Sequence, residues 1–232
     1  MNALLSHRAT KPLLFVLALL PLAQLVYRAL TDSLGANPAE ALSRGSGDWV
    51  LRFLCLTLAV TPARQWTGWN ALARLRRMLG LYAFFYGVLH FLCYAWLDMG
   101  FVPADIVRDI PKRPFVLAGF AALMLMLPLA ATSFNRAIKA MGGLRWRRLH
   151  RLVYLIVVLA LLHFYWMRAG KHDFAEVGVY AAIVAVLLGW RIYAAWRARA
   201  SATARRDAAH AKQPVALHVT ARARPSPPSA GT

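Results

Sequence analysis

Two histidines, His90 and His163, carry the strongest chemical signal in this chain of 232 residues. His90 lies in the apolar stretch LGLYAFFYGVLHFLCYAWL, and His163 lies in the apolar stretch LVYLIVVLALLHFYW. An imidazole inside a long apolar helix is costly, because it needs polar partners that lipid does not supply. Both histidines are therefore candidates for a functional site.

The two histidines are expected at nearly the same depth on two different helices. Counted from the basic segment before each stretch, His90 lies eleven residues in, about 16 Å along a helix, and His163 lies twelve residues in. Two imidazoles at one depth can bind both axial positions of a haem iron. The alternative is that each histidine bonds a carbonyl or a serine of a neighbouring helix. Zinc fits less well, since no third or fourth ligand is found at this depth.

Aromatic and small residues near the two histidines are suited to surround a flat ring. Ligation by two histidines would leave the iron no open position, which favours electron transfer over chemistry at the metal. The residues that we expect to line a haem are Phe84, Phe85, Gly87, Phe91, Phe164, Tyr165 and Trp166.

A third histidine, His150, precedes His163 by thirteen residues, about 20 Å along a helix. On an ideal helix the two side chains lie about 140° apart, so they do not share a face. The matching position on the helix of His90 falls near Arg76 and Arg77, which cannot bind iron. Three roles stay open for His150: ligand of a second haem with an unidentified partner, contact with a quinone or flavin, or cap of the helix start.

Arginines surround His150 in the sequence WRRLHR. Such a cluster is typical of a topology signal that contacts lipid phosphates. The alternative is that Arg147 and Arg151 hold haem propionates or a cofactor phosphate, because the guanidinium group matches paired oxygens.

The composition predicts an all-α integral membrane protein. Hydrophobic residues make up 59% of the chain and charged residues only 16%, which leaves too little polar surface for a soluble domain of this size. The net charge of +19 lies in short clusters between apolar stretches, a pattern typical of membrane topology rather than of nucleic-acid binding.

Six segments have the length and composition of membrane-spanning helices, which together form one bundle. Residues 1–12 are then an N-terminal segment, 13–196 the six-helix domain, and 197–232 a basic, disordered tail that contacts membrane lipid. The expected spans are Leu13–Leu30, Trp49–Val60, Leu79–Leu97, Phe115–Ser133, Leu152–Met167 and Val177–Trp196.

The distribution of charge predicts the orientation of these spans. One set of connections carries 20 of the 28 Lys and Arg residues, and the opposite set carries eight of the nine acidic residues. Because basic connections stay on the cytoplasmic side, both termini are predicted to be cytoplasmic.

The chain resembles a known family in the segments RRMLGLYAFFYGVLHFLCYAWLD, DIPKRPFVLAGF, LAATS and WRRLHRLVYLIVVLALLHFYW. These resemble the haem-binding membrane subunit of the bacterial periplasmic methionine sulfoxide reductase system, the MsrQ/YedZ family. More distantly, they are similar to the ferric reductase-like transmembrane domain. The resemblance covers roughly Pro12 to Trp196.

This resemblance implies an electron-transfer subunit rather than a catalytic one. It implies b-type haem, in one copy or two, with a bound FMN as a further cofactor and quinol or a cytoplasmic flavin reductase as electron donor. The implied acceptor is a periplasmic, molybdopterin-containing methionine sulfoxide reductase that repairs oxidised proteins. The family's haem ligands fall on His90 and His163, and its third histidine falls on His150.

Two other classes of protein are alternatives. A proton-relay transporter could use His90 and His163, but it would need acidic residues inside the spans, and the predicted spans have none. A non-redox membrane scaffold would leave the equal depth of the two histidines unexplained.

Overall fold

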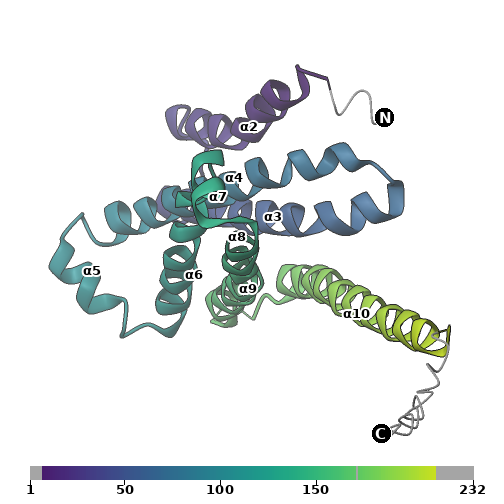
Figure 1. The fold of residues 1–232 in the computed structure, drawn as a ribbon. Helices are drawn as coiled ribbons and strands as arrows, with labels where there is room; N and C mark the ends of the chain where they lie inside the picture. The colour runs from purple at the N-terminus through teal and green to yellow at the C-terminus, as the bar shows by residue number, and fades with distance from the viewer. Residues whose placement is uncertain (1–6, 171, 213–232) are drawn as a thin grey trace, which may run out of the picture. The chain divides into compact units, whose positions relative to one another are not determined.

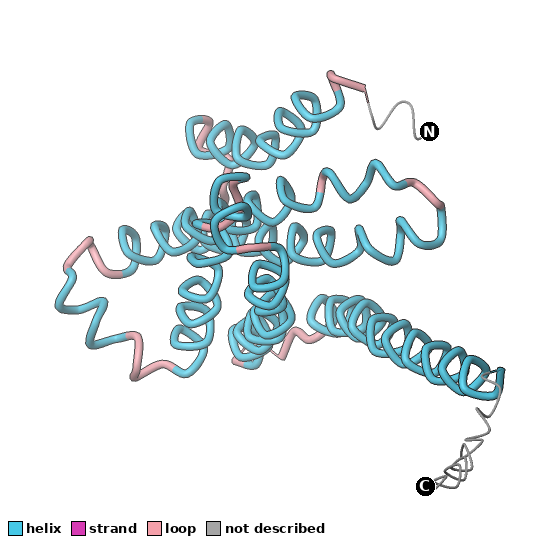
Figure 2. Tube along the Cα trace, viewed as in Figure 1, coloured by secondary structure: helices cyan, strands magenta, loops and turns pink. Residues whose placement is uncertain are grey.

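The computed structural model describes residues 7–170 and 172–212, the last six of them by their backbone alone, and all regular elements in these residues are helical (Figure 1 and Figure 2). The chain forms two compact units, Met1–Trp190 and Arg191–Thr232, and the candidate site lies in the first. The longer helices, in chain order, are α2 (Thr10–Leu30), α3 (Pro38–Thr67), α4 (Arg76–Cys93), α6 (Pro114–Ala131), α9 (Val153–Ala169) and α10 (Ala175–Lys212). The shorter elements are η1 (Asn70–Arg74), η2 (Tyr94–Asp98), α5 (Pro103–Asp109), α7 (Asn135–Met141), α8 (Gly143–Leu149) and η3 (His150–Leu152).

Five helical segments are long and apolar enough to cross a membrane, among the residues that the structure describes. They are Thr10–Leu30, Arg76–Asp98, Pro114–Ala131, Gly143–Ala169 and Ala175–Arg206. The prediction of an all-helical membrane protein with several spans therefore agrees with the structure, whereas a sixth span is not confirmed.

The segment missing from this set is α3, which is longer and more polar than the sequence predicted. The expected span Trp49–Val60 is only the middle of a helix of 30 residues. Asn37 caps its start by accepting a hydrogen bond from the backbone N–H of Glu40, and Gly68 ends it in the left-handed conformation with φ of 70°. The first half carries four charged residues at four-residue spacing, which form the ion pairs Glu40–Arg44 and Asp48–Arg52. One face of α3 is therefore charged, and acidic residues do lie inside this helix.

Two helix pairs hold the core of the first unit. Helix α3 packs along α4, and α6 packs along α9, with α4 meeting α6 and α3 meeting α9 (Figure 1). The largest completely buried side chains are Leu58, Tyr86, Ile156 and Val157, which come from α3, α4 and α9. The Tyr86 hydroxyl also donates to the carbonyl of Ala18, at 2.8 Å, and so ties α2 to this core. The packing of α3 and α6 against α4 and α9 thus fixes the positions of the two helices that carry His90 and His163.

The C-terminal prediction was wrong in one respect. Helix α10 continues to Lys212, so residues 197–212 are helical rather than disordered. The segment RARASATARRDAAHAK is rich in alanine and arginine, which are among the strongest helix formers. The rest of the predicted tail, 213–232, lies outside the described residues.

Candidate functional site

The structure brings His90 of α4 and His163 of α9 together. Their ring centroids lie 5.8 Å apart, and the ring planes make an angle of 79°. The sequence predicted that the two histidines lie at nearly the same depth, and the contact between their rings agrees with that prediction. Seventy-three residues separate the two histidines in the chain, so the fold alone creates the pair.

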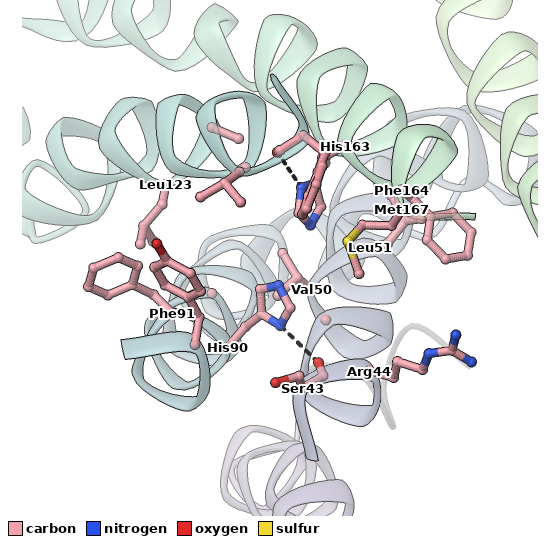
Figure 3. Close-up of a pocket in the computed structure, with 18 of the residues that line it drawn as sticks. Ser43, Arg44, Val50, Leu51, His90, Phe91, Leu123, His163, Phe164 and Met167 are labelled. Atoms are coloured by element: carbon pink, nitrogen blue, oxygen red, sulfur yellow. Dashed lines mark hydrogen bonds between the residues drawn. The ribbon is translucent and has the colours of Figure 1, made fainter. Parts of the chain in front are cut away.

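Each histidine is held by a backbone carbonyl of a neighbouring helix. Nδ1 of His90 lies 2.8 Å from the carbonyl oxygen of Ser43 in α3, and Nδ1 of His163 lies 2.6 Å from that of Phe115 in α6. A carbonyl oxygen only accepts, so in both rings Nδ1 carries the proton and donates it. The second nitrogen, Nε2, then keeps its lone pair, and Figure 3 shows that the second ring nitrogen of each histidine faces the other ring.

Two glycines make room for the imidazole rings. A Cβ atom on Gly47 would lie 3.0 Å from Cε1 of His90, and a Cβ atom on Gly119 would lie 2.8 Å from Nδ1 of His163. Each glycine follows the accepting carbonyl by four residues on the same helix, one turn later. Each histidine ring therefore contacts the same two features of a neighbouring helix, a backbone carbonyl and a glycine one helical turn later.

A cavity of about 330 Å³ surrounds the pair, and we call it the paired-histidine cavity. Of the predicted lining residues, Gly87, Phe91 and Phe164 line it. The other lining side chains include ones that the sequence did not single out, from α3, η2, α6 and α9: Leu51, Leu54, Tyr94, Phe115, Phe120, Leu123, Met126 and Ile156. The wall is mostly apolar and aromatic, which suits a flat hydrophobic ligand.

Four predicted lining residues lie elsewhere. Phe84 lines a second cavity, and Phe85 packs on the rings of Tyr82 and Tyr86. Tyr165 and Trp166 are exposed residues of α9 and do not line the paired-histidine cavity. Consecutive helical residues point about 100° apart, so neighbours of a histidine in sequence cannot all face its ligand.

Three arginines at the paired-histidine cavity are already bound to carboxylates. Arg44 pairs with Glu40, and Arg113 pairs with Asp109, whose carboxylate also accepts from the Tyr94 hydroxyl at 2.7 Å. Hydrogen bonds from the Arg113 guanidinium hold the pKa of Asp109 below its usual range. The third arginine is Arg168, which pairs with both Asp173 and Glu176.

His150 lies at a second cavity, of about 350 Å³, which we call the arginine cavity. Its lining includes Arg76, Arg77, Arg147 and Arg151. The helix is distorted at this point, because the 3₁₀ turn η3 separates α8 from α9. Among the lining residues that the structure describes, His150 is the one histidine, so no second imidazole ligand faces it.

The two cavities share a thin wall. Leu54, Met126 and Ile156 line both of them. A ligand in the arginine cavity would therefore lie one layer of side chains away from a ligand between His90 and His163.

The geometry of the paired histidines fits haem better than it fits another metal centre. Each Nε2 is available as a ligand, and the hydrogen bond at each Nδ1 is the support that metal-binding histidines receive in proteins. In the described part of the chain, no group of three or more His, Cys, Asp or Glu residues is placed to bind a metal ion. Two imidazoles with an apolar cavity between helices would suit a porphyrin, which brings four nitrogen ligands of its own.

The sequence matches known proteins over most of its length. Residues 46–161 match the family model "Ferric reductase like transmembrane component". The chain is 66% identical over 192 residues to the protein-methionine-sulfoxide reductase heme-binding subunit MsrQ of Polaromonas naphthalenivorans, covering 83% of this chain and 88% of that protein. It is 56% identical to the MsrQ subunit of Ralstonia nicotianae, with the same shares covered.

A more distant relative is the magnetosome protein MamZ of Magnetospirillum gryphiswaldense, which is 46% identical over 193 residues. The matched region covers 81% of this chain but only 29% of that protein. No solved structure matches the chain. Because the identity and coverage of the MsrQ relatives are high, the chain belongs to the MsrQ/YedZ family of heme-binding subunits, within the ferric reductase-like transmembrane proteins.

Proposed function

We propose that this protein is a membrane haem b electron-transfer subunit that serves a methionine sulfoxide reductase. Its donor is the quinol pool or a cytoplasmic flavin reductase, and its acceptor is a periplasmic, molybdopterin-containing catalytic subunit that repairs oxidised methionines. The observation that carries this proposal is the pair of histidines held by Nδ1, each with its Nε2 turned toward the other. The names of the MsrQ relatives support it, since they describe heme-binding subunits of that reductase.

His90 and His163 would hold the haem, one from α4 and one from α9. A bound haem supplies a one-electron couple at its iron. The carbonyls of Ser43 and Phe115 keep both imidazoles in the Nδ1–H tautomer and fix their orientation. Apolar side chains around the rings, such as Phe91 and Phe164, exclude water from the site.

His150, Arg147 and Arg151 would form a second, donor-side site. They line a cavity that is separated from the paired histidines by one layer of side chains. A flavin, a quinone or a second haem are the cofactors considered for it. The single imidazole in the described lining argues against a second haem held by two histidines.

The orientation that we propose has six spans, with α3 as the additional one, in the bacterial inner membrane. Both termini are then cytoplasmic, and the connection that contains α5 faces the periplasm. Asp98 and Asp105 in this region are exposed, whereas Asp109 is engaged by Arg113 and Tyr94. A periplasmic partner would therefore dock on Asp98 and Asp105 more readily than on Asp109.

The optical spectrum of the detergent-purified protein, oxidised and then reduced with dithionite, tests the proposal. We expect the bands of a low-spin b-type haem, with about one haem per chain by the pyridine haemochrome assay. Protein that is reconstituted with haem and binds none would contradict the proposal. That result would favour a proton-relay transporter, for which Asp48 at the same cavity would be an acidic partner of the histidines.

A further inference from the structure

The arginine cavity differs from an ordinary apolar gap because four guanidinium groups surround it. Arg76 and Arg77 come from the start of α4, whereas Arg147 and Arg151 come from α8 and η3. These two segments are far apart in sequence, and the fold places their charges around one hollow. Arg76 is half-buried, and the other three lie exposed at the rim.

The four arginines lack acidic partners. Of the described residues that line the cavity, none is acidic, and no ion pair joins any of the four to a carboxylate in the described part of the chain. Arg77 donates to the side-chain oxygen of Asn135, at 2.7 Å, which is a neutral acceptor. Four like charges around one cavity repel one another, so an anion is the complementary ligand.

His150 adds a buried polar atom to the same cavity. Its Nδ1 lies 3.1 Å from the carbonyl oxygen of Trp146, so this nitrogen donates within the chain. Its Nε2 is buried and has no hydrogen-bond partner. An unpaired buried polar atom is destabilising, and because Nδ1 carries the proton, Nε2 is an acceptor to which a hydroxyl group of a ligand, such as a protonated phosphate oxygen, would donate.

An aromatic surface lies beside the charges. The ring of His150 stacks on Trp146 with a centroid distance of 4.0 Å and an interplanar angle of 28°. The cavity continues toward the apolar side chains Leu54, Met126 and Ile156. Its ligand is therefore charged at the arginine rim and apolar toward the interior.

We propose that the arginine cavity binds the phosphate group of an amphipathic ligand. Arg76, Arg77, Arg147 and Arg151 hold the phosphate at the rim, and the apolar part of the ligand points toward the shared wall. This inference names the ligand class of the donor-side site, so its role in electron transfer rests on the proposed function. Phosphate rather than carboxylate fits best, because several guanidinium groups can share the oxygens of one phosphate. The phosphate could belong to a nucleotide cofactor or to an anionic lipid, and the experiment separates the two.

The test is a pair of titrations of the full chain in phosphatidylcholine nanodiscs, with flavin mononucleotide and with riboflavin as probes. The two probes share the flavin ring and differ in the phosphate. We expect flavin mononucleotide to bind about tenfold more tightly than riboflavin, measured by quenching of flavin fluorescence. We also expect the double variant Arg147→Gln/Arg151→Gln to remove this preference and to leave the weak binding of riboflavin unchanged.

The matched control is the double variant Arg145→Gln/Arg148→Gln. It removes the same charge from the same segment, at two exposed residues that do not line the cavity. The control should retain the preference for the phosphate. The proposal would be overturned if both double variants lost the preference for flavin mononucleotide equally and also lost bound phosphatidylglycerol equally in the second arm. Such a result would show unspecific attraction to a basic surface.

The second arm uses phosphatidylglycerol. If a lipid supplies the phosphate, native mass spectrometry should find phosphatidylglycerol retained on the wild type and on the control. It should find none on Arg147→Gln/Arg151→Gln. Added phosphatidylglycerol should also displace flavin mononucleotide from the wild type. A second haem per chain that disappears in Arg147→Gln/Arg151→Gln would overturn the proposal, since the arginines would then hold propionates. The haem spectrum of the wild type tests the proposed function separately, so the failure of one inference can be told from the failure of the other.

Discussion

The two cavities of this protein are similar in volume but opposite in electrostatic design. At the paired-histidine cavity, Arg44, Arg113 and Arg168 are each neutralised by carboxylates, and two imidazoles face one another. At the arginine cavity the guanidinium groups have no carboxylate partner among the described residues, and one imidazole stands alone. Neutral surroundings with two preset ligands suit a porphyrin, whereas an excess of positive charge suits an anion.

The difference shows how one helix pair supports two sites. Along α4, His90 lies at one cavity and Arg76 with Arg77 lies at the other, so the second site lacks an imidazole on this helix. Along α9 and η3, histidines are present at both levels, at His150 and at His163. The two cavities thus differ in what α4 contributes, an imidazole at one and guanidinium groups at the other.

The largest effect should come from replacing by alanine the two glycines that contact the histidine rings, Gly119 and Gly47. Gly119→Ala would place a Cβ atom 2.8 Å from Nδ1 of His163 and should displace the ring from the Phe115 carbonyl. We expect a lower haem content and a changed low-spin signal in electron paramagnetic resonance. Gly47→Ala should have the smaller effect, because its Cβ atom would lie 3.0 Å from the ring of His90.

Gly178→Ala is the matched control for Gly47→Ala and Gly119→Ala, since a Cβ atom at Gly178 has open space. The control should keep the haem content and the spectrum of the wild type. A spectrum that stays unchanged in both Gly47→Ala and Gly119→Ala would show that these two glycines do not determine the orientation of the histidine rings. Binding of flavin mononucleotide should be unaffected in all three variants, which keeps the two cavities distinct.

A smaller effect is expected where a carboxylate is removed from the paired-histidine cavity. Asp109→Asn leaves Arg113 without its ion-pair partner and makes this rim resemble the arginine cavity. Because both side chains are partly exposed to solvent, the loss of stability should be below about 1 kcal/mol, measured by thermal unfolding. Arg113 should also gain affinity for sulfate, and a variant that gains none would contradict the comparison of the two rims.

The same pair predicts a pH dependence of stability. Since the pKa of Asp109 is lowered in the folded state, the pair stabilises the fold at pH values above the ordinary carboxyl range. This contribution is lost as the pH falls through the lowered pKa, below a pH of about 4. Asp109→Asn lacks the titrating carboxylate. When the pH is lowered from about 6 to about 3, the variant should therefore lose less stability than the wild type loses.

The sequence was sufficient to predict the helical class and the meeting of His90 with His163. Depth along a helix follows from counting residues at a fixed rise, so equal depth on two helices can be read without a structure. Their hydrogen-bond acceptors could not be predicted in this way, because which face of which helix packs on a histidine is a tertiary property. Gly47 and Gly119 were missed for the same reason, although a glycine inside a predicted helix is a signal of close packing.

Other errors have local causes. The expected span covered only the apolar middle of α3, whereas the charged residues before it continue the helix and pair with each other along one face. The helix of residues 197–212 was missed because low hydrophobicity was taken as disorder despite strong helix formers. The charges of Arg76 and Arg77 were noticed, but only the fold shows that they face Arg147 and Arg151 around one cavity.

The most direct test of the central claim is the low-spin haem content of three variants purified in parallel, His90→Ala, His163→Ala and His150→Ala. Electron paramagnetic resonance should show the low-spin signal lost in His90→Ala and in His163→Ala, because each would remove one of the two proposed haem ligands. The signal should persist in His150→Ala, whose imidazole lies at the other cavity. A full complement of low-spin haem in His90→Ala or in His163→Ala would contradict the assignment of the paired histidines as the haem ligands.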